Sequence, residues 1–205
     1  MRRAALLGVG IAAVLGVLVW LNDPPSARGA LPVLAGPSQL SRVDPELSAA
    51  LTKLGGRRGE VRCWSISDWE ERSAEFAAAR GEPAVPGRVL AGYLSLDRER
   101  VNLPGRTCNR LASLGLSRAD AAAAKVFAHE LQHFRGVRDE ALAECYGIQS
   151  IPSVAATLGL RGADARALAL TAWTELYPTE NPVYHAAGCV NGGPLDLRPT
   201  VADWP

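Results

Sequence analysis

Two of the three histidines in this chain stand four residues apart, and that spacing is the strongest constraint on how the chain can fold. They begin and end the run from His129 to His133, which reads His-Glu-Leu-Gln-His. On an α-helix such residues differ by about 40° around the axis and about 6 Å along it, so both imidazoles point to one side. The helix-forming run Ala121–Ala124 precedes them, and apolar Phe127 and Phe134 flank them. The sequence therefore predicts a packed helix whose two histidines can share one metal ion.

The ends of this helix and the residue between its histidines refine the prediction. Ser117, with Asp120 three positions later, matches a capping box, and Gly136 is a typical helix end. The expected cofactor is Zn²⁺, which takes imidazole nitrogens at about 2.0–2.1 Å in tetrahedral sites. Glu130 is rotated by about 100° from His129, so it does not easily join the same coordination shell. It can instead take a proton from a water molecule activated by the metal, which is the role of a general base.

Three acidic residues after the helix can supply the third metal ligand: Asp139, Glu140 and Glu144. In one arrangement Asp139 ends the pattern H-E-x-x-H-x-x-G-x-x-D, which resembles the metzincin pattern with Asp in place of the third His. Metzincins also need a methionine beneath the metal, and Met1 is the only methionine here, so this arrangement is disfavoured. In the other arrangement the chain reverses at Gly136 and a second helix packs antiparallel to the first. Glu140 and Glu144 then lie on one face, one turn apart.

The segment from Glu140 to Cys145 carries a further resemblance. It matches E-x-x-A-[DE]-C and so resembles a segment of bacterial neutral zinc peptidases, and of gluzincins generally. That resemblance implies a zincin-like fold in which Glu140 ligates the metal. It also implies that Glu144 accepts a hydrogen bond from the far nitrogen of His129. A wider resemblance, to a group of exported bacterial proteins, covers the ranges His129–His133, Gly136–Ala141, Glu144–Tyr146 and Gly192–Pro199.

The N-terminus predicts export. Arg2 and Arg3 precede Ala4–Leu21, an uncharged stretch about 27 Å long as a helix, which is enough to cross a bilayer core. The arginines should stay on the cytoplasmic side and leave the remainder outside, as a single-pass membrane protein. A signal peptide cleaved near the small residues Ala27 and Gly29 is the alternative, and it would give a secreted protein.

Composition along the chain predicts three parts: residues 1–21, an anchor or signal segment; residues 22–42, a linker rich in Pro, Gly and Ser; and residues 43–205, one domain. Apolar periodicity predicts that the domain is α+β and mostly helical, with a small antiparallel sheet. Pro152 is expected to interrupt the second motif helix. The expected strands are Glu60–Ser65, Val89–Leu96 and Arg100–Leu103. The expected helices open at Pro45 and at Ser67, which forms a capping box with Glu70, and then cover Pro104–Gly115, Ser117–Gly136, Arg138–Gln149 and Ala163–Leu176.

Export makes the four cysteines informative. They form no C-x-x-C pair, so a cysteine zinc cluster is not expected, and an even number in an oxidising compartment favours two disulfides. Of the three pairings that four cysteines allow, the sequential one is favoured, Cys63–Cys108 with Cys145–Cys189. The second bridge would bring Tyr184 and His185 near the metal, where either could stabilise an oxyanion. The alternative for His185 is a histidine on a surface loop.

The expected function is zinc-dependent hydrolysis of a peptide or amide bond in the cell envelope, with Glu130 as general base. The substrate would be a peptide, a protein or a cell-wall peptide, and the N-terminal helix would contact the membrane. Nucleic acid is not an expected partner, because the net charge is only +1 and no basic block is present. One alternative is a non-catalytic, membrane-tethered envelope protein in which zinc joins two helices. Another is a protein that binds no metal.

Overall fold

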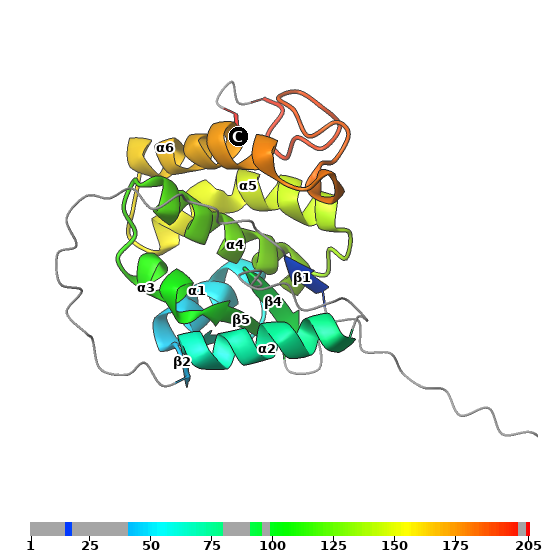
Figure 1. Cartoon of the computed structure of the whole chain (residues 1–205). Helices are drawn as coiled ribbons and strands as arrows, with labels where there is room; N and C mark the ends of the chain where they lie inside the picture. The colour runs from blue at the N-terminus through cyan, green and yellow to red at the C-terminus, as the bar shows by residue number, and fades with distance from the viewer. Residues whose placement is uncertain (1–14, 18–40, 80–90, 96–98, 201–203) are drawn as a thin grey trace, which may run out of the picture.

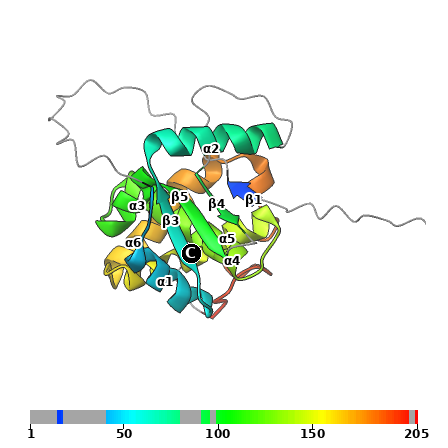
Figure 2. The same ribbon diagram turned by 90° about the horizontal axis from the view of Figure 1, so that it is seen from below.

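A computed structural model of the chain describes residues 15–17, 41–79, 91–95, 99–200 and 204–205. These residues form a mostly helical α+β domain with one sheet, which confirms the predicted class (Figures 1 and 2). The described helices are α1 (Pro45–Gly55), α2 (Ile66–Ala79), α3 (Gly105–Ala112), α4 (Arg118–Phe134), α5 (Glu140–Thr157) and α6 (Ala163–Thr171).

The sheet has the strand order β1-β4-β5-β3-β2. Its strands are β1 (Leu15–Val17), β2 (Arg42–Val43), β3 (Glu60–Trp64), β4 (Gly92–Ser95) and β5 (Arg100–Pro104). β4 and β5 pair antiparallel, but β3 and β5 run parallel, with Val61 opposite Val101. The prediction of an antiparallel sheet is therefore wrong at its centre. The reason is topological. After β3 the chain crosses one face of the sheet as α2 and then forms β4 and β5, and β5 rather than β4 pairs with β3.

Only Leu15–Val17 of the predicted membrane helix lies within the described part of the chain. These three residues form β1, which pairs antiparallel with β4, so the helix prediction is wrong for them. Pairing with β4 satisfies backbone groups that an edge strand would otherwise leave open. Residues 1–14 and 18–40, which hold the rest of the predicted anchor and most of the linker, lie outside the described residues. Among the helices that the structure describes, none has the length and apolar character needed to cross a membrane.

Helices cover both faces of the sheet. In both views α2 lies across one face, while α1, α3 and α4 lie on the other (Figures 1 and 2). On the α2 side, Trp69 stacks on Tyr93 of β4 with ring centroids 5.8 Å apart. On the opposite side, the disulfide between Cys63 and Cys108 joins β3 to α3, as the sequential pairing predicted. The core is therefore enclosed between the sheet and α4.

Local capping explains where α1 and α2 begin. The side chain of Asp44 accepts hydrogen bonds from two backbone N–H groups of the first turn of α1, and Pro45 is its first residue, as predicted. For α2 the predicted cap, Ser67, is wrong. The hydroxyl of Ser65 accepts the hydrogen bond from the backbone N–H of Asp68, at 3.1 Å, so the helix begins earlier, at Ile66.

α4 is the central helix of the domain. The predicted capping box is present: the N–H of Asp120 lies 3.2 Å from the hydroxyl of Ser117, and the N–H of Ser117 lies 3.1 Å from the carboxylate of Asp120. Every residue from Asp120 to Phe134 is buried. The small side chains of Ala121–Ala124 let neighbouring elements approach from all sides. The two motif histidines consequently lie inside the core.

α5 does not stop at Pro152 as predicted, but continues to Thr157. A proline inside a helix lacks the N–H that would bond to the carbonyl four residues earlier, which normally favours a break. Here Ile151 and Val154 are completely buried on either side of Pro152, so tertiary packing holds the helix together. The last predicted helix also differs, because α6 ends at Thr171 and the chain continues as a π-helical segment over Ala172–Leu176.

Candidate metal centre

Two helices supply the candidate metal site: α4 carries both histidines, and α5 carries two glutamates. The Nε2 atoms of His129 and His133 are 2.8 Å apart. Oε2 of Glu140 lies 3.1 Å from Nε2 of His129 and 3.4 Å from Nε2 of His133. The three predicted ligands thus meet at one point, and they form a group that can hold a metal ion.

The outer nitrogen of each ring faces an acceptor. Nδ1 of His129 lies 2.7 Å from Oε2 of Glu144, and Nδ1 of His133 lies 2.7 Å from the carbonyl oxygen of Val137. A carbonyl oxygen and an ionised carboxylate can only accept, so each Nδ1 carries the hydrogen. In a neutral ring, Nε2 then presents a lone pair. Two imidazole lone pairs and a carboxylate oxygen therefore face one another. Only a cation between them, a proton or a metal ion, removes the repulsion of these electron pairs.

The spacing of the three atoms suits a metal ion. A tetrahedral ion with ligands at about 2.0–2.1 Å places neighbouring ligand atoms about 3.3 Å apart. The three observed separations, 2.8, 3.1 and 3.4 Å, lie around that value. Glu144 and the Val137 carbonyl hold the rings as outer partners do in metal sites, by accepting from the nitrogen that does not face the metal.

The pKa values of the site also show that this group of atoms favours a bound positive charge. Burial opposes a charge on His129, but hydrogen bonds to Glu140 and Glu144 outweigh it and raise the pKa of His129 to about 9. Burial likewise opposes ionisation of Glu140, but hydrogen bonds from His129 and His133 lower its pKa to about 2. A proton held at this point occupies the place that a metal ion would take.

Glu130 lies beside this group with a different environment. Its side chain is completely buried, and neither carboxylate oxygen has a hydrogen-bond partner among the described residues. Burial raises the pKa of Glu130 to about 7, against the opposing attraction of His129 and His133. A carboxylate with a pKa near neutrality is suited to take up and release a proton.

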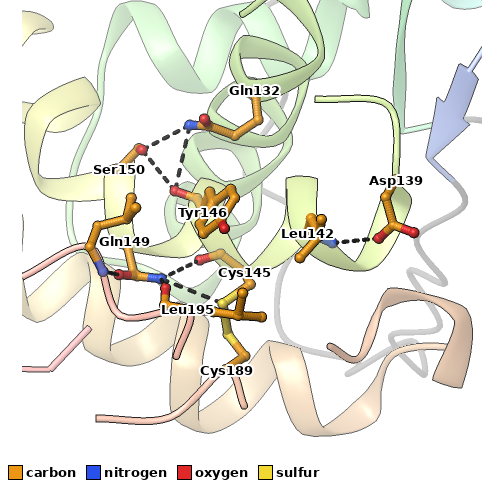
Figure 3. Close-up of a disulfide and its surroundings, with 10 residues drawn as sticks. Gln132, Asp139, Leu142, Cys145, Tyr146, Gln149, Ser150, Cys189 and Leu195 are labelled. Carbon is orange, nitrogen blue, oxygen red and sulfur yellow. Dashed lines mark hydrogen bonds between the residues drawn. A yellow bond between two sulfur atoms is a disulfide. The ribbon is translucent and has the colours of Figure 1, made fainter. Parts of the chain in front are cut away.

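Asp139, the alternative ligand, has another role. It is the exposed N-cap of α5, where Oδ1 accepts a hydrogen bond from the N–H of Leu142 at 2.8 Å (Figure 3). It does not belong to the group of three ligand atoms, which contains Glu140 instead. The cap fixes the start of α5, and Glu140 is the first residue after it.

α4 and α5 cross at an angle, so only some of their contacts join residues in the order expected of two strictly antiparallel helices. The two histidines meet the two glutamates in that order, since the later histidine reaches the earlier glutamate. Gln132, near the end of α4, instead donates to the hydroxyl of Ser150 at 2.8 Å, in the second half of α5 (Figure 3). In a strictly antiparallel pair the end of α4 would contact only the start of α5. The end of α4 therefore lies beside the second half of α5 as well as beside its start.

Two glycines that the sequence interpretation did not consider make room for the site. A Cβ at Gly147 of α5 would lie 3.1 Å from backbone atoms of His129, so the glycine permits the close crossing of α4 and α5. A Cβ at Gly92 of β4 would lie 3.2 Å from Oε1 of Glu130 and 3.0 Å from the side chain of Val126. Neither glycine belongs to a motif, so only the fold identifies them.

The structure also surrounds Glu144 with charged residues that were not predicted. Nζ of Lys125 lies 2.7 Å from Oε1 of Glu144 and forms a second ion pair with Glu180. Lys125 does carry a sequence signal, because it precedes His129 by one helical turn on the same face and is one of only two lysines in the chain. Glu180 carries none, since it lies 55 residues further along the chain than Lys125.

The C-terminal tail, residues 177–200, brings one of the two predicted oxyanion residues to the site. The ring of Tyr184 is buried and lies edge-on to that of His129, with centroids 6.0 Å apart. His185 faces away: its Nε2 lies 2.8 Å from the carbonyl oxygen of Tyr177, and the two rings are 4.6 Å apart. Tyr184 and His185 thus have different surroundings although they are adjacent in sequence.

The tail is fastened to α5 by the second predicted disulfide, Cys145–Cys189 (Figure 3). Gln149, one turn further along α5, strengthens this attachment. Its amide nitrogen donates to the carbonyl of Leu195 at 2.9 Å (Figure 3). Its amide oxygen accepts from the N–H of Leu197 at 2.7 Å. Both disulfides indicate an oxidising environment.

Comparisons with known proteins add no family to this description. No protein-family model matches the chain, and neither the curated proteins nor the solved structures contain a significant match. The zincin resemblance of the motif therefore stays a prediction.

Proposed function

We propose that the protein is a zinc-dependent hydrolase that cleaves a peptide or amide bond outside the cytoplasm. The observation that carries the proposal is the meeting of His129, His133 and Glu140, whose lone pairs face one another beside a buried carboxylate, that of Glu130, with no hydrogen-bond partner in the described part of the chain. The two disulfides support a location in an oxidising compartment. The substrate class is a peptide, a protein or a cell-wall peptide.

In this proposal each residue has one role. A bound Zn²⁺ ion would supply Lewis acidity, which polarises a carbonyl group and acidifies water. Glu130 takes the proton from the attacking water and delivers it to the leaving amine. Its pKa, raised by burial to about 7, lets it both accept and release that proton near neutral pH. Glu144 keeps the ring of His129 oriented through the hydrogen bond at Nδ1.

A second candidate function is a non-catalytic envelope protein in which the metal joins α4 to α5. The burial of the site favours it, because His129 and Glu130 are 0% exposed and His133 is 2% exposed. A substrate must reach this group past Glu140, whose side chain is 20% exposed. The two candidates differ in what they require of Glu130, since a purely structural metal needs no neighbouring base.

The test is elemental analysis of the full chain, followed by a broad peptide-library cleavage assay on the wild type and on Glu130→Gln. We expect about one zinc per chain in both proteins, because Glu130 is not a ligand, and cleavage by the wild type alone. Glu175→Gln makes the same substitution at an exposed ion pair and should leave both properties unchanged. Zinc in both proteins with no difference in cleavage would favour the structural role, and a wild type without metal would refute both candidates.

A further inference from the structure

Lys125 is a buried cation that the proposed chemistry does not use. Its side chain is 1% exposed, and it lies in the middle of the core on α4. Burying an ammonium group is costly unless opposite charges and hydrogen bonds compensate for it. The groups around Lys125 must therefore compensate for the cost of burying its charge.

Those neighbours are two carboxylates from different parts of the chain. Glu144 of α5 is 0% exposed and lies 2.7 Å from Nζ of Lys125, and Glu180 of the C-terminal tail is 7% exposed and forms the second ion pair. Burial opposes the charge on Lys125, but the two carboxylates outweigh it and raise the pKa of the ammonium group. Lys125 is therefore a permanent cation between Glu144, whose pKa is lowered by Lys125 and His129 in spite of burial, and Glu180, whose pKa is raised by burial to about 8.

Glu144 connects this cation to the metal site. One carboxylate oxygen, Oε1, accepts from Lys125, and the other, Oε2, accepts from Nδ1 of His129 at 2.7 Å. Two donors on two oxygens leave the carboxylate a single orientation. Without the ammonium group, Oε1 would lose its charged donor, and Glu180, which also hydrogen-bonds to Glu144, would be left to hold the carboxylate on that side.

The spacing along α4 places these groups in one line. Lys125, His129 and His133 follow one another at intervals of four, so they share one face of the helix. Gly147 brings α5 against this face at the level of His129, one turn beyond Glu144. The arrangement therefore depends on the same helix crossing that creates the site.

We propose that Lys125 is a positioning residue of the metal centre, which holds Glu144 on His129 so that Nε2 of His129 faces the metal. Glu180 lies beside the same pair, where it contacts Lys125 and hydrogen-bonds to Glu144. This inference rests on the metal binding in the proposed function, and it concerns the affinity for the metal rather than the hydrolysis itself. Outer partners of metal ligands typically change metal affinity by about 10–100-fold, so we expect a loss of about tenfold without Lys125.

The test compares two variants of the full chain. Lys125→Met leaves two buried carboxylates without a cation, so it should lower both the melting temperature of the metal-free protein and the affinity for Zn²⁺. Lys125→Met combined with Glu180→Met removes both members of the second ion pair and gives Glu144 no replacement donor. It should recover much of the melting temperature but keep the loss of about tenfold in Zn²⁺ affinity, measured by competition with a chromophoric chelator. If Lys125→Met does not fold, the double variant decides alone.

A matched control is Gln149→Ala, which removes a buried polar anchor between α5 and the tail but leaves the Cys145–Cys189 bridge to hold the tail, and touches neither Lys125 nor Glu144. It should lower the melting temperature with little change in Zn²⁺ affinity. The visible spectrum of bound Co²⁺ gives a second readout, and we expect it to change in both Lys125 variants and not in the control. A double variant that binds Zn²⁺ within about twofold of the wild type would overturn the inference while leaving the proposed function intact. A wild type that binds no Zn²⁺ would overturn both.

Discussion

The backbone of Gly147 in α5 lies against the backbone of His129 in α4, and a Cβ at position 147 would come within 3.1 Å of Cα and N of His129. Backbone atoms of a packed helix cannot rotate aside as a side chain can. The ligand from α4 and the carboxylates from α5 are therefore held in contact by the absence of one side chain.

Replacing Gly147 by Ala should consequently separate the helices. Inside a helix this substitution normally stabilises a protein by about 1 kcal/mol. Here we expect a loss of about 1–3 kcal/mol from overpacking, together with weaker Zn²⁺ binding. Chemical unfolding of the metal-free protein and chelator competition measure the two effects. A stabilised variant with unchanged affinity would show that the helix crossing tolerates a Cβ at position 147.

The choice between Glu140 and Asp139 as third ligand can be tested by paired substitutions. Glu140→Gln should abolish or strongly reduce metal binding, because it removes the carboxylate that faces both rings. Asp139→Ala should keep the metal affinity but cost about 1 kcal/mol of stability through loss of the helix cap. Elemental analysis and thermal unfolding of both variants check this, and loss of metal in Asp139→Ala alone would reverse the assignment.

The two disulfides offer another matched pair, because they join residues 44 and 45 positions apart. Loops of nearly equal length predict similar stabilisation, of about 2–5 kcal/mol for each bridge. Replacing Cys145 and Cys189 by Ser should also weaken metal binding, because this bridge holds the tail that carries Glu180 and Tyr184. Replacing Cys63 and Cys108 should lower the melting temperature without that effect. Equal metal affinities in the two double variants would argue against a role for the tail.

The metal-free protein should lose stability as the pH rises. The pKa of His129 is raised from 6.5 to about 9, so the folded chain holds a proton that the unfolded chain releases. This stabilisation is fully present below pH 6.5 and is lost as the pH rises through about 9. Glu130 acts in the same direction, since its pKa is raised from 4.5 to about 7.

Melting temperatures measured in the presence of a chelator, from about pH 5 to about pH 9, check this expectation. Saturating Zn²⁺ should reduce the dependence on pH, because the ion takes the place of the proton between the ligands. A melting temperature of the metal-free protein that rises between pH 6.5 and pH 9 would contradict the assigned charges.

Local sequence was enough to predict the elements that carry the site. The capping box at Ser117 and the spacing of His129 and His133 involve residues within about one or two helical turns, so their geometry follows from the helix itself. The predicted start of α1 at Pro45 follows from the same kind of local signal. Such interactions do not depend on how the rest of the chain packs.

Tertiary packing decided the features that sequence reasoning predicted wrongly or did not consider. β5 pairs in parallel with β3, α5 continues through Pro152, and Glu180 reaches Lys125 from 55 residues away. None of these has a local signal, because each depends on which distant surface shields the backbone or balances a buried charge. The sequence thus determined which side chains one helix presents, while the three-dimensional fold alone decided which acidic group meets them and what holds that group in place.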